Sequence, residues 1–244
     1  MAQAGEPSLE ILPAQVEPHP AIVAALDAIP KAILDRSGSV FYSGRAAFAA
    51  PSSLYIVGLN PGGDPVAQAA ETIGAHLQRF RDGQPWWSEY ADESWRGAKP
   101  GEGGMQPRVL HMIARLGLDA RAVPASNVVF IRSSTEATLN SEKSEMLRLC
   151  WQVHHAVIEA LGVHVVLCFG STAGRWVREA LAAGTCIDFY VEENARQWRS
   201  EAHRADNGRI VVTLTHPGRA NWRSAQSDPS PLVQRALAVA VAMP

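Results

Sequence analysis

The chain has 244 residues, of which 47% are hydrophobic, and a formal net charge of -2 at pH 7. This length and this apolar content suit one α/β domain with a sizeable core, and they exclude global disorder. The near-neutral charge argues against a histone-like polybasic binder, but it is compatible with a local basic patch.

The apolar pattern alternates between short buried runs and amphipathic segments along most of the chain. Short apolar runs closed by turn residues predict strands at 53–59, 125–134, 163–170 and 208–218. Helical periodicity predicts helices at 21–36, interrupted by Pro30, and at 106–118, 141–162, 171–184 and 230–242. This alternation predicts a three-layer α/β/α sandwich around a central, mainly parallel, four-stranded sheet.

Three segments fall outside this alternation. Residues 1–19 are rich in Pro, Ala and Glu, and we expect a loosely held arm before a single domain over 20–244. Residues 39–48 indicate a hairpin or an edge segment. Residues 64–104 are long, aromatic and punctuated by glycine, which is typical of a functional or partly disordered segment.

The cysteines and the N-terminus bear on the compartment. Cys150, Cys168 and Cys186 form no C-x-x-C pair, and three cysteines are too few for a four-cysteine iron–sulfur or zinc centre. We expect them to be reduced. The first twenty residues lack the basic region and apolar core of a secretion signal, and no apolar run is long enough to span a membrane. These features predict a cytoplasmic protein.

Polar and glycine residues follow all four predicted strands. In a parallel sheet covered by helices, the ligand lies beyond the carboxyl ends of the strands. Each of these residues alone is compatible with an ordinary turn or helix cap. Because they meet at one edge of the sheet, we interpret them as one site. They are Gly58, Leu59, Asn60, Pro61 and Gly62 after the first strand, Asn127 in the second, Gly170 and Ser171 after the third, and His216, Pro217 and Gly218 after the fourth.

Cleavage of a base from a sugar is the chemistry that fits these residue types. The target nucleotide must leave the base stack and enter a pocket, where an amide such as Asn127 can pair with N3–H and O4 of uracil. Asn60 can hold water at the sugar carbon without being a strong base. His216 can donate a hydrogen bond to the base as it departs as an anion. Glycines allow backbone N–H groups to approach base and phosphate.

The motifs resemble those of the uracil-DNA glycosylase superfamily, in the Gly-x-Asn-Pro-Gly form of the mismatch-specific and single-strand-selective branches. The resemblance covers roughly residues 39–242 and implies catalytic roles for Asn60 and His216, with Asn127 binding the base. The matching segments are GLNPG for the first motif, SNVVFIRSS for the base-binding strand, VVLCFGSTAGRWV for the later strand and helix, and THPGRANWRS for the second catalytic motif.

The resemblance also implies further contacts. Gly58, Leu59, Pro61 and Gly62 are expected at the base, with Trp86, Trp87 and Phe80 as candidates for stacking on it. We expect DNA contacts from Ser171, Gly218, Arg219, Trp222 and Arg223. The arginines suit phosphates, and Trp222 is a candidate wedge for the gap beside the flipped base, although a tucked Trp in a solvated loop is equally compatible.

Three positions depart from the best-known branch of that family. That branch has Asp at the position of Asn60, which predicts a slower enzyme here, with Asp64 as an alternative base. That branch has Tyr at the position of Gly62, and this Tyr excludes bases with a 5-methyl group. Gly62 has no side chain to exclude them. The same branch has Ser at the position of Gly218, so one phosphate contact is lost.

The sequence is compatible with three functions. The first is a monofunctional, monomeric uracil-DNA glycosylase of base-excision repair, which needs no metal or other cofactor. No lysine stands in a motif to form a Schiff base, so a lyase step is not expected. The second is a non-catalytic member of the same fold that binds a base or damaged DNA. The third is a nucleotide- or phosphate-handling enzyme, although residues 58–63 match neither G-x-x-x-x-G-K-[ST] nor G-x-G-x-x-G.

Overall fold

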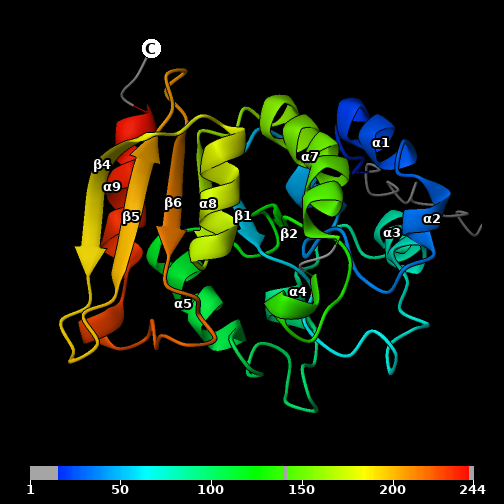
Figure 1. Ribbon diagram of the computed structural model, residues 1–244, viewed down its shortest axis with the longest axis horizontal. Helices are drawn as coiled ribbons and strands as arrows, with labels where there is room; N and C mark the ends of the chain where they lie inside the picture. The colour runs from blue at the N-terminus through cyan, green and yellow to red at the C-terminus, as the bar shows by residue number, and fades with distance from the viewer. Residues whose placement is uncertain (1–15, 140–141, 242–244) are drawn as a thin grey trace, which may run out of the picture.

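The computed structural model describes residues 16–139 and 142–241, which fold around one six-stranded sheet (Figure 1). The strand order is β2-β1-β3-β6-β5-β4. The first four strands in this order are parallel, and β5 and β4 are antiparallel to their neighbours. The strands are β1 (Leu54–Gly58), β2 (Ala125–Asn127), β3 (Val165–Phe169), β4 (Thr185–Val191), β5 (Arg199–Arg204) and β6 (Ile210–Leu214).

The parallel part of the sheet consists of the four predicted strands, so the predicted fold class is confirmed with a larger sheet. The β4–β5 hairpin was missed because it lacks a continuous apolar run. Strand β4 lies at the edge of the described sheet, next to β5, and none of its seven residues is buried. Edge strands commonly carry such polar, exposed residues, which hide them from an apolar pattern.

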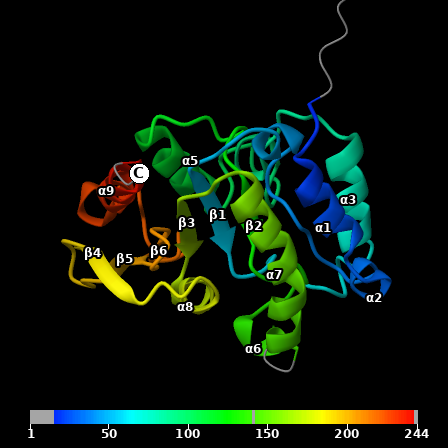
Figure 2. The ribbon, with the colours of Figure 1, turned by 90° about the horizontal axis from the view of Figure 1, so that it is seen from above.

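Helices cover both faces of the sheet, as the view from above shows (Figure 2). Because side chains alternate along a strand, Tyr55 and Val57 of β1 pack with α1 and α7, whereas Leu54 and Ile56 pack with α5 and α9. None of the helices within the described residues is long and apolar enough to cross a membrane. The helices are α1 (Pro20–Asp27), α2 (Lys31–Leu34), α3 (Ile73–Asp82), α4 (Glu89–Asp92), α5 (Gln106–Arg115), α6 (Glu136–Leu139), α7 (Lys143–Ala160), α8 (Ser171–Ala180) and α9 (Ser230–Val241).

The first helices show the predicted break at proline. Helix α1 ends at Asp27, and Pro30 stands directly before α2 as its N-cap. Nδ1 of His19 accepts a hydrogen bond of 3.2 Å from the N–H of Ala21 at the start of α1. The predicted arm lies outside the described residues up to residue 15, and the single domain over 20–244 stays a prediction.

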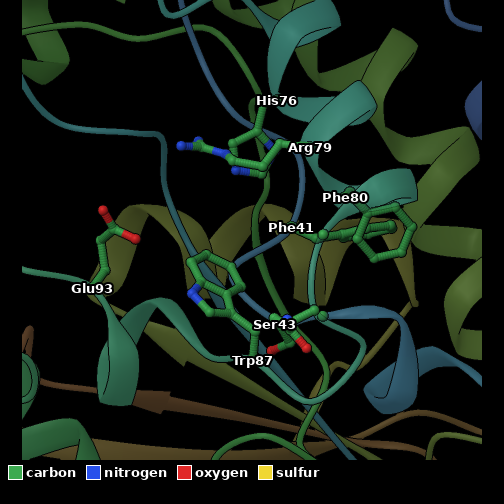
Figure 3. Close-up of a pocket in the computed structure, with 10 residues that line it drawn as sticks. Phe41, Ser43, His76, Arg79, Phe80, Trp87 and Glu93 are labelled. Atoms are coloured by element: carbon green, nitrogen blue, oxygen red, sulfur yellow. The ribbon is translucent and has the colours of Figure 1, made fainter.

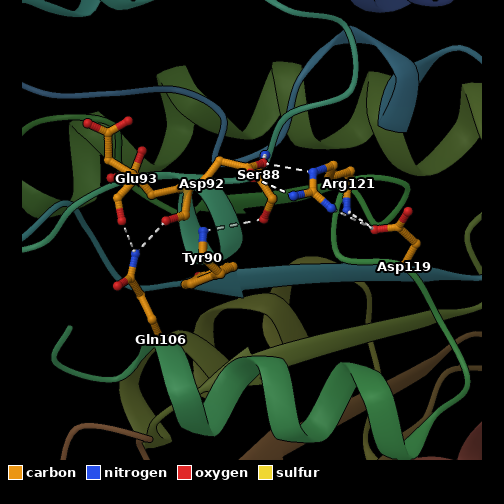
Figure 4. Close-up of polar contacts among 8 residues, drawn as sticks. Ser88, Tyr90, Asp92, Glu93, Gln106, Asp119 and Arg121 are labelled. Carbon is orange, nitrogen blue, oxygen red and sulfur yellow. Dashed lines mark hydrogen bonds and ion pairs between the residues drawn. The ribbon is translucent and has the colours of Figure 1, made fainter. Parts of the chain in front are cut away.

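The segment 64–104 is more ordered than its composition indicates, because it contains α3 and α4. The Arg121 side chain binds the Asp92 carboxylate, with Nε 3.0 Å from Oδ2 (Figure 4). The Gln106 amide donates to the carbonyls of Glu89 and Glu93, both at 2.8 Å. The side chains of Gln106 in α5 and of Arg121 therefore hold α4 in place.

Residues 37–43 form an edge segment beside β2, and no hairpin is present within it. Antiparallel bridges join Gly38 to Ile131 and Phe41 to Ser126. The N–H of Tyr42 also donates to the carbonyl of Ala125 at 2.8 Å. This pairing brings the segment next to the strand that carries Asn127.

Behind β2, the buried His154 of α7 is expected to make stability depend on pH. Its Nδ1 lies 2.8 Å from the Tyr55 hydroxyl, and burial lowers its pKa from 6.5 to about 4. Between these two pH values the unfolded chain binds more protons than the folded chain, so the free energy of unfolding falls as the pH falls through this window. One such histidine contributes ~1.4 kcal/mol per pH unit there.

We therefore expect His154→Phe to flatten the loss of stability between pH 6.5 and about 4, measured by urea denaturation at several pH values. The matched control is His155→Phe, because the neighbouring His155 side chain is 61% exposed. An unchanged slope in the His154 variant would contradict the assignment.

Candidate active site

The loop after β1 is held to the chain after β2 by its carbonyl groups. The carbonyls of Gly58, Leu59, Pro61 and Gly62 accept hydrogen bonds from Val128 N, Val129 N, Ser133 N and Arg132 Nη1, at 2.9, 2.9, 3.1 and 2.6 Å. The Arg132 side chain also reaches Ser37 Oγ at 3.2 Å and Glu71 Oε2 at 2.7 Å. We call residues 58–63 the Asn-Pro-Gly loop.

Several N–H groups of the same loop, in contrast to its carbonyls, make no hydrogen bond within the described residues. Those of Asn60, Gly62 and Gly63 donate to no group within residues 16–139 and 142–241. A loop whose carbonyls are bound and whose amides are free presents donors to an electron-rich ligand. A carbonyl oxygen of a base, or a base leaving as an anion, is such a ligand.

Asn60 is anchored through its amide nitrogen. Nδ2 donates to the Pro61 carbonyl at 2.8 Å and to Ser133 Oγ at 3.0 Å. The Oδ1 makes no hydrogen bond within the described part of the chain, and an amide oxygen is an acceptor. Asn60 is therefore oriented to accept a hydrogen bond from water.

Asp64, the alternative base, has another role in this structure. Its exposed carboxylate accepts a hydrogen bond of 2.8 Å from the N–H of Val66 and so caps the next turn. The structure gives no support to Asp64 as a base.

Asn127 lies directly opposite Gly58 in the pairing of β1 with β2. It is 4% exposed, and its Nδ2 has no partner among the described residues. A Cβ atom on Gly58 would stand 2.3 Å from Asn127 Oδ1. Glycine at this position therefore makes room for the Asn127 side chain, and a buried free donor indicates a ligand that accepts from it.

Tyr42 is a site residue that sequence reasoning missed. Burial, with a smaller effect of the Glu89 charge, raises its pKa to about 12, although the neighbouring side chains of Asn127 and Ser39 lower it. Its hydroxyl is therefore protonated at neutral pH beside the base-binding candidate. The available signal was the extended segment 37–43, but the pairing with β2 could not be deduced from it.

His216 follows β6, and a local hydrogen bond fixes its tautomer. The Gly218 N–H donates to Nδ1 of His216 at 3.0 Å. Burial, and secondarily the Arg219 charge, lowers the pKa of His216, so the ring is neutral at pH 7 with its proton on Nε2. A Cβ atom on Gly218 would lie 2.9 Å from Nδ1, so a serine here would crowd the ring.

Topology sets the separation of the two catalytic candidates. Strand β3 lies between β1 and β6, so the Asn-Pro-Gly loop and His216 are two strand spacings apart, roughly 10 Å. Gly170 directly follows β3 with a φ of +91°, and a Cβ there would contact the His216 ring at 3.6 Å. The strand between the two candidates is therefore followed by a residue without a side chain.

Four of the predicted DNA-contacting residues, Ser171, Gly218, Arg219 and Arg223, are exposed near this edge of the sheet. The prediction for Trp222 as a wedge is wrong in this structure. Trp222 is 0% exposed and packs against Phe169, with ring centroids 5.3 Å apart. The indole belongs to the core, where burial outweighs any role in the loop.

The predicted stacking residues differ in exposure. Trp86 is 56% exposed, whereas Trp87 is half-buried and Phe80 is buried. Trp87 and Phe80 line a cavity whose walls include none of Asn60, Asn127 and His216. A base-stacking role for Trp86 and Trp87 stays a prediction.

The fold and the site define an α/β protein that presents hydrogen-bond donors to a ligand at the carboxyl edge of a parallel sheet. A family model described as the uracil DNA glycosylase superfamily matches residues 47–238. The protein belongs to this superfamily. A search of curated proteins finds no match. Membership supports DNA glycosylase activity, with DNA as the substrate, at the level of the family.

Gly58→Ala tests the fit between Gly58 and Asn127. The added Cβ pushes the Asn127 side chain aside, because it would stand 2.3 Å from Oδ1. We expect glycosylase activity to fall about tenfold or more, with little change in melting temperature. The control is Gly184→Ala, because a Cβ on Gly184 meets nothing within 4 Å and this glycine precedes β4, outside the site. Equal activity in the two variants would refute this role of Gly58.

Ser133→Ala tests the anchor of Asn60. Loss of one neutral hydrogen bond is expected to lower kcat roughly threefold to tenfold and to leave KM unchanged, because Asn60 holds water and not the base. Single-turnover excision measures the effect, with the exposed neighbour Ser134→Ala as control. A change confined to KM would show that Ser133 acts in substrate binding instead.

Proposed function

We propose that this protein removes uracil, or a close analogue, from DNA by hydrolysis of the N-glycosidic bond and leaves an abasic site. The observation that carries the proposal is the polarity of the Asn-Pro-Gly loop beside Asn127. Bound carbonyls, free N–H groups and a buried free amide donor match a flipped pyrimidine, whose carbonyl oxygens need donors.

Base binding follows from the side chains at the ends of β1 and β2. The Asn127 amide pairs with the Watson–Crick edge of uracil, with Nδ2 donating to O4 and Oδ1 accepting from N3–H. The free N–H groups of the Asn-Pro-Gly loop approach O2. The Tyr42 hydroxyl, kept protonated, supports Asn127 from the edge segment.

Cleavage uses Asn60 and His216 on the two sides of the nucleotide. As the bond between sugar and base lengthens, positive charge develops on the sugar and negative charge on the base. Asn60 Oδ1 holds the water that attacks the sugar carbon, and the proton that this water loses is taken up by the base released as an anion. The Nε2–H of His216 donates to O2 of the departing base, and its neutral state makes this a hydrogen bond without full proton transfer.

The space at Gly62 sets the range of bases. A Cβ there would meet nothing within 4 Å, so no side chain stands where the best-known branch has its tyrosine. We therefore propose that 5-substituted uracils, thymine in mismatches among them, are accepted as well as uracil.

The alternative is a non-catalytic protein that binds a base or damaged DNA at the same site. Asn60 favours it, because an amide cannot act as a general base. This alternative predicts affinity for uracil-containing DNA without its cleavage.

A strand-cleavage assay separates the two functions. Labelled oligonucleotides with one uracil, single-stranded or opposite A or G, are incubated with the protein and then treated with alkali. We expect breaks that depend on alkali, reduced roughly 10²-fold or more in His216→Ala, as for loss of one donor to a developing anion. We expect Asn60→Ala to be reduced as well.

Matched controls for this assay are available on the surface. Asn207→Ala and His155→Ala remove an exposed amide and an exposed imidazole, and both are expected to cleave like wild type. Breaks without alkali would reveal a lyase step and contradict the monofunctional mechanism. No breaks on any uracil or 5-substituted substrate, despite binding, would favour the alternative.

A further inference from the structure

A cavity of about 240 Å³ lies between α3 and the segment 84–93, beside the edge segment (Figure 3). None of Asn60, Asn127 and His216 lines it, so it is distinct from the candidate active site. Its volume equals that of about eight liquid waters, which leaves room for one aromatic heterocycle.

Aromatic rings form much of its wall. Phe41 and Phe80 meet edge to face, with ring centroids 5.1 Å apart. In Figure 3 the Trp87 indole lies on the other side of the cavity from His76 and Arg79. Such walls favour a planar, aromatic ligand, because bases stack on aromatic side chains.

His76 lines the cavity and carries a buried polar atom without a partner among the described residues. The side chain is 7% exposed, and its buried Nδ1 has no hydrogen-bond partner within the described residues. Burial, with smaller effects of Arg79 and Arg132, lowers its pKa to about 3, so the imidazole is neutral at pH 7. A buried unpaired nitrogen is costly unless a ligand or water completes it.

Two charged side chains that line the cavity limit the class of ligand that it can bind. Neither Arg79 nor Glu93 forms an ion pair or side-chain hydrogen bond within residues 16–139 and 142–241. A cation and a carboxylate together do not suit a lipid tail, and the carboxylate disfavours phosphate. The edge of a nucleobase carries both acceptors and donors, which match the two side chains.

We propose that this cavity binds a nucleobase, stacked on Trp87 and hydrogen-bonded to His76. Two sources share this chemistry: a base next to the flipped nucleotide in the DNA strand, and a free nucleoside. Phe41 and Ser43 line the cavity, and Tyr42 between them lies beside Asn127, so the edge segment separates the cavity from the candidate active site. Binding of a base from the DNA strand rests on the proposed function, whereas binding of a free nucleoside does not.

The test is direct binding, followed by NMR of the full chain labelled with ¹⁵N at histidine. The His76 Nδ1 resonance is assigned by its loss in His76→Phe. We expect it to shift saturably when deoxyadenosine, deoxyguanosine, deoxycytidine or deoxyuridine is added. The Kd is expected to rise roughly fivefold to a hundredfold in Trp87→Ala, and to be unchanged in the control Trp86→Ala, whose side chain is exposed.

A second arm identifies the source. The protein is titrated with a single-stranded oligonucleotide that has a stable abasic analogue at the target position. A His76 shift that disappears when the flanking bases are also replaced by abasic analogues supports the strand as the source. A shift with nucleosides and none with oligonucleotides supports a free nucleoside.

Two results would overturn the proposal: a His76 resonance that moves with neither probe, and equal weakening by Trp86→Ala and Trp87→Ala. Binding is measured without turnover, so the outcome for the cavity does not depend on the outcome for the proposed function. Normal uracil excision by a protein whose His76 resonance does not shift overturns only the cavity proposal. Nucleoside binding at His76 without excision of any base overturns only the proposed function.

Discussion

The hydrogen bonds between the Asn-Pro-Gly loop and residues 128–133 are the constraint on which the candidate site depends. They bind four carbonyls of the loop and leave three of its N–H groups free. They also place Ser133 where it holds the Asn60 amide at 3.0 Å. Without this pairing the loop would have no fixed polarity, and Asn60 would be free to rotate.

The sheet positions the two site residues that lie outside the Asn-Pro-Gly loop, Asn127 and His216. Parallel pairing of β1 with β2 places Asn127 against Gly58, and β3 lies between β1 and β6, the strand that His216 follows. Glycine at 58, 170 and 218 stands at the three points where a Cβ would contact Asn127 or His216. These three glycines are therefore explained by close approach of side chains within the site, before any contact with DNA is considered.

Strand ends and their residues could be predicted from the sequence, because buried strands in a parallel sheet are continuous apolar runs and their carboxyl ends share one edge. Partners remote in the chain could not be. Ser133 lies 73 residues from Asn60, and nothing in its local sequence marks it as an anchor. Tyr42 reaches Asn127 only through pairing of the edge segment with β2.

Trp222 shows the opposite error. Its place in a polar loop after His216 suits a wedge, but a large indole beside Phe169 gains more from burial, and the loop folds back to bury it. The exposed arginines of that loop, Arg219 and Arg223, remain as candidates for phosphate contacts. A residue other than Trp222 must therefore fill the gap that a flipped nucleotide leaves in the DNA.

The central claim is that the free N–H groups of the Asn-Pro-Gly loop and the free Nδ2 of Asn127 bind the base. The most direct measurement is the change in ¹H–¹⁵N amide shifts when free uracil is added to the full chain. The account predicts shifts at Asn60, Gly62, Gly63 and the Asn127 side chain, and none at Val128 and Val129, whose N–H groups are already bound. Saturable uracil binding that leaves the loop amides and Asn127 unchanged would contradict it.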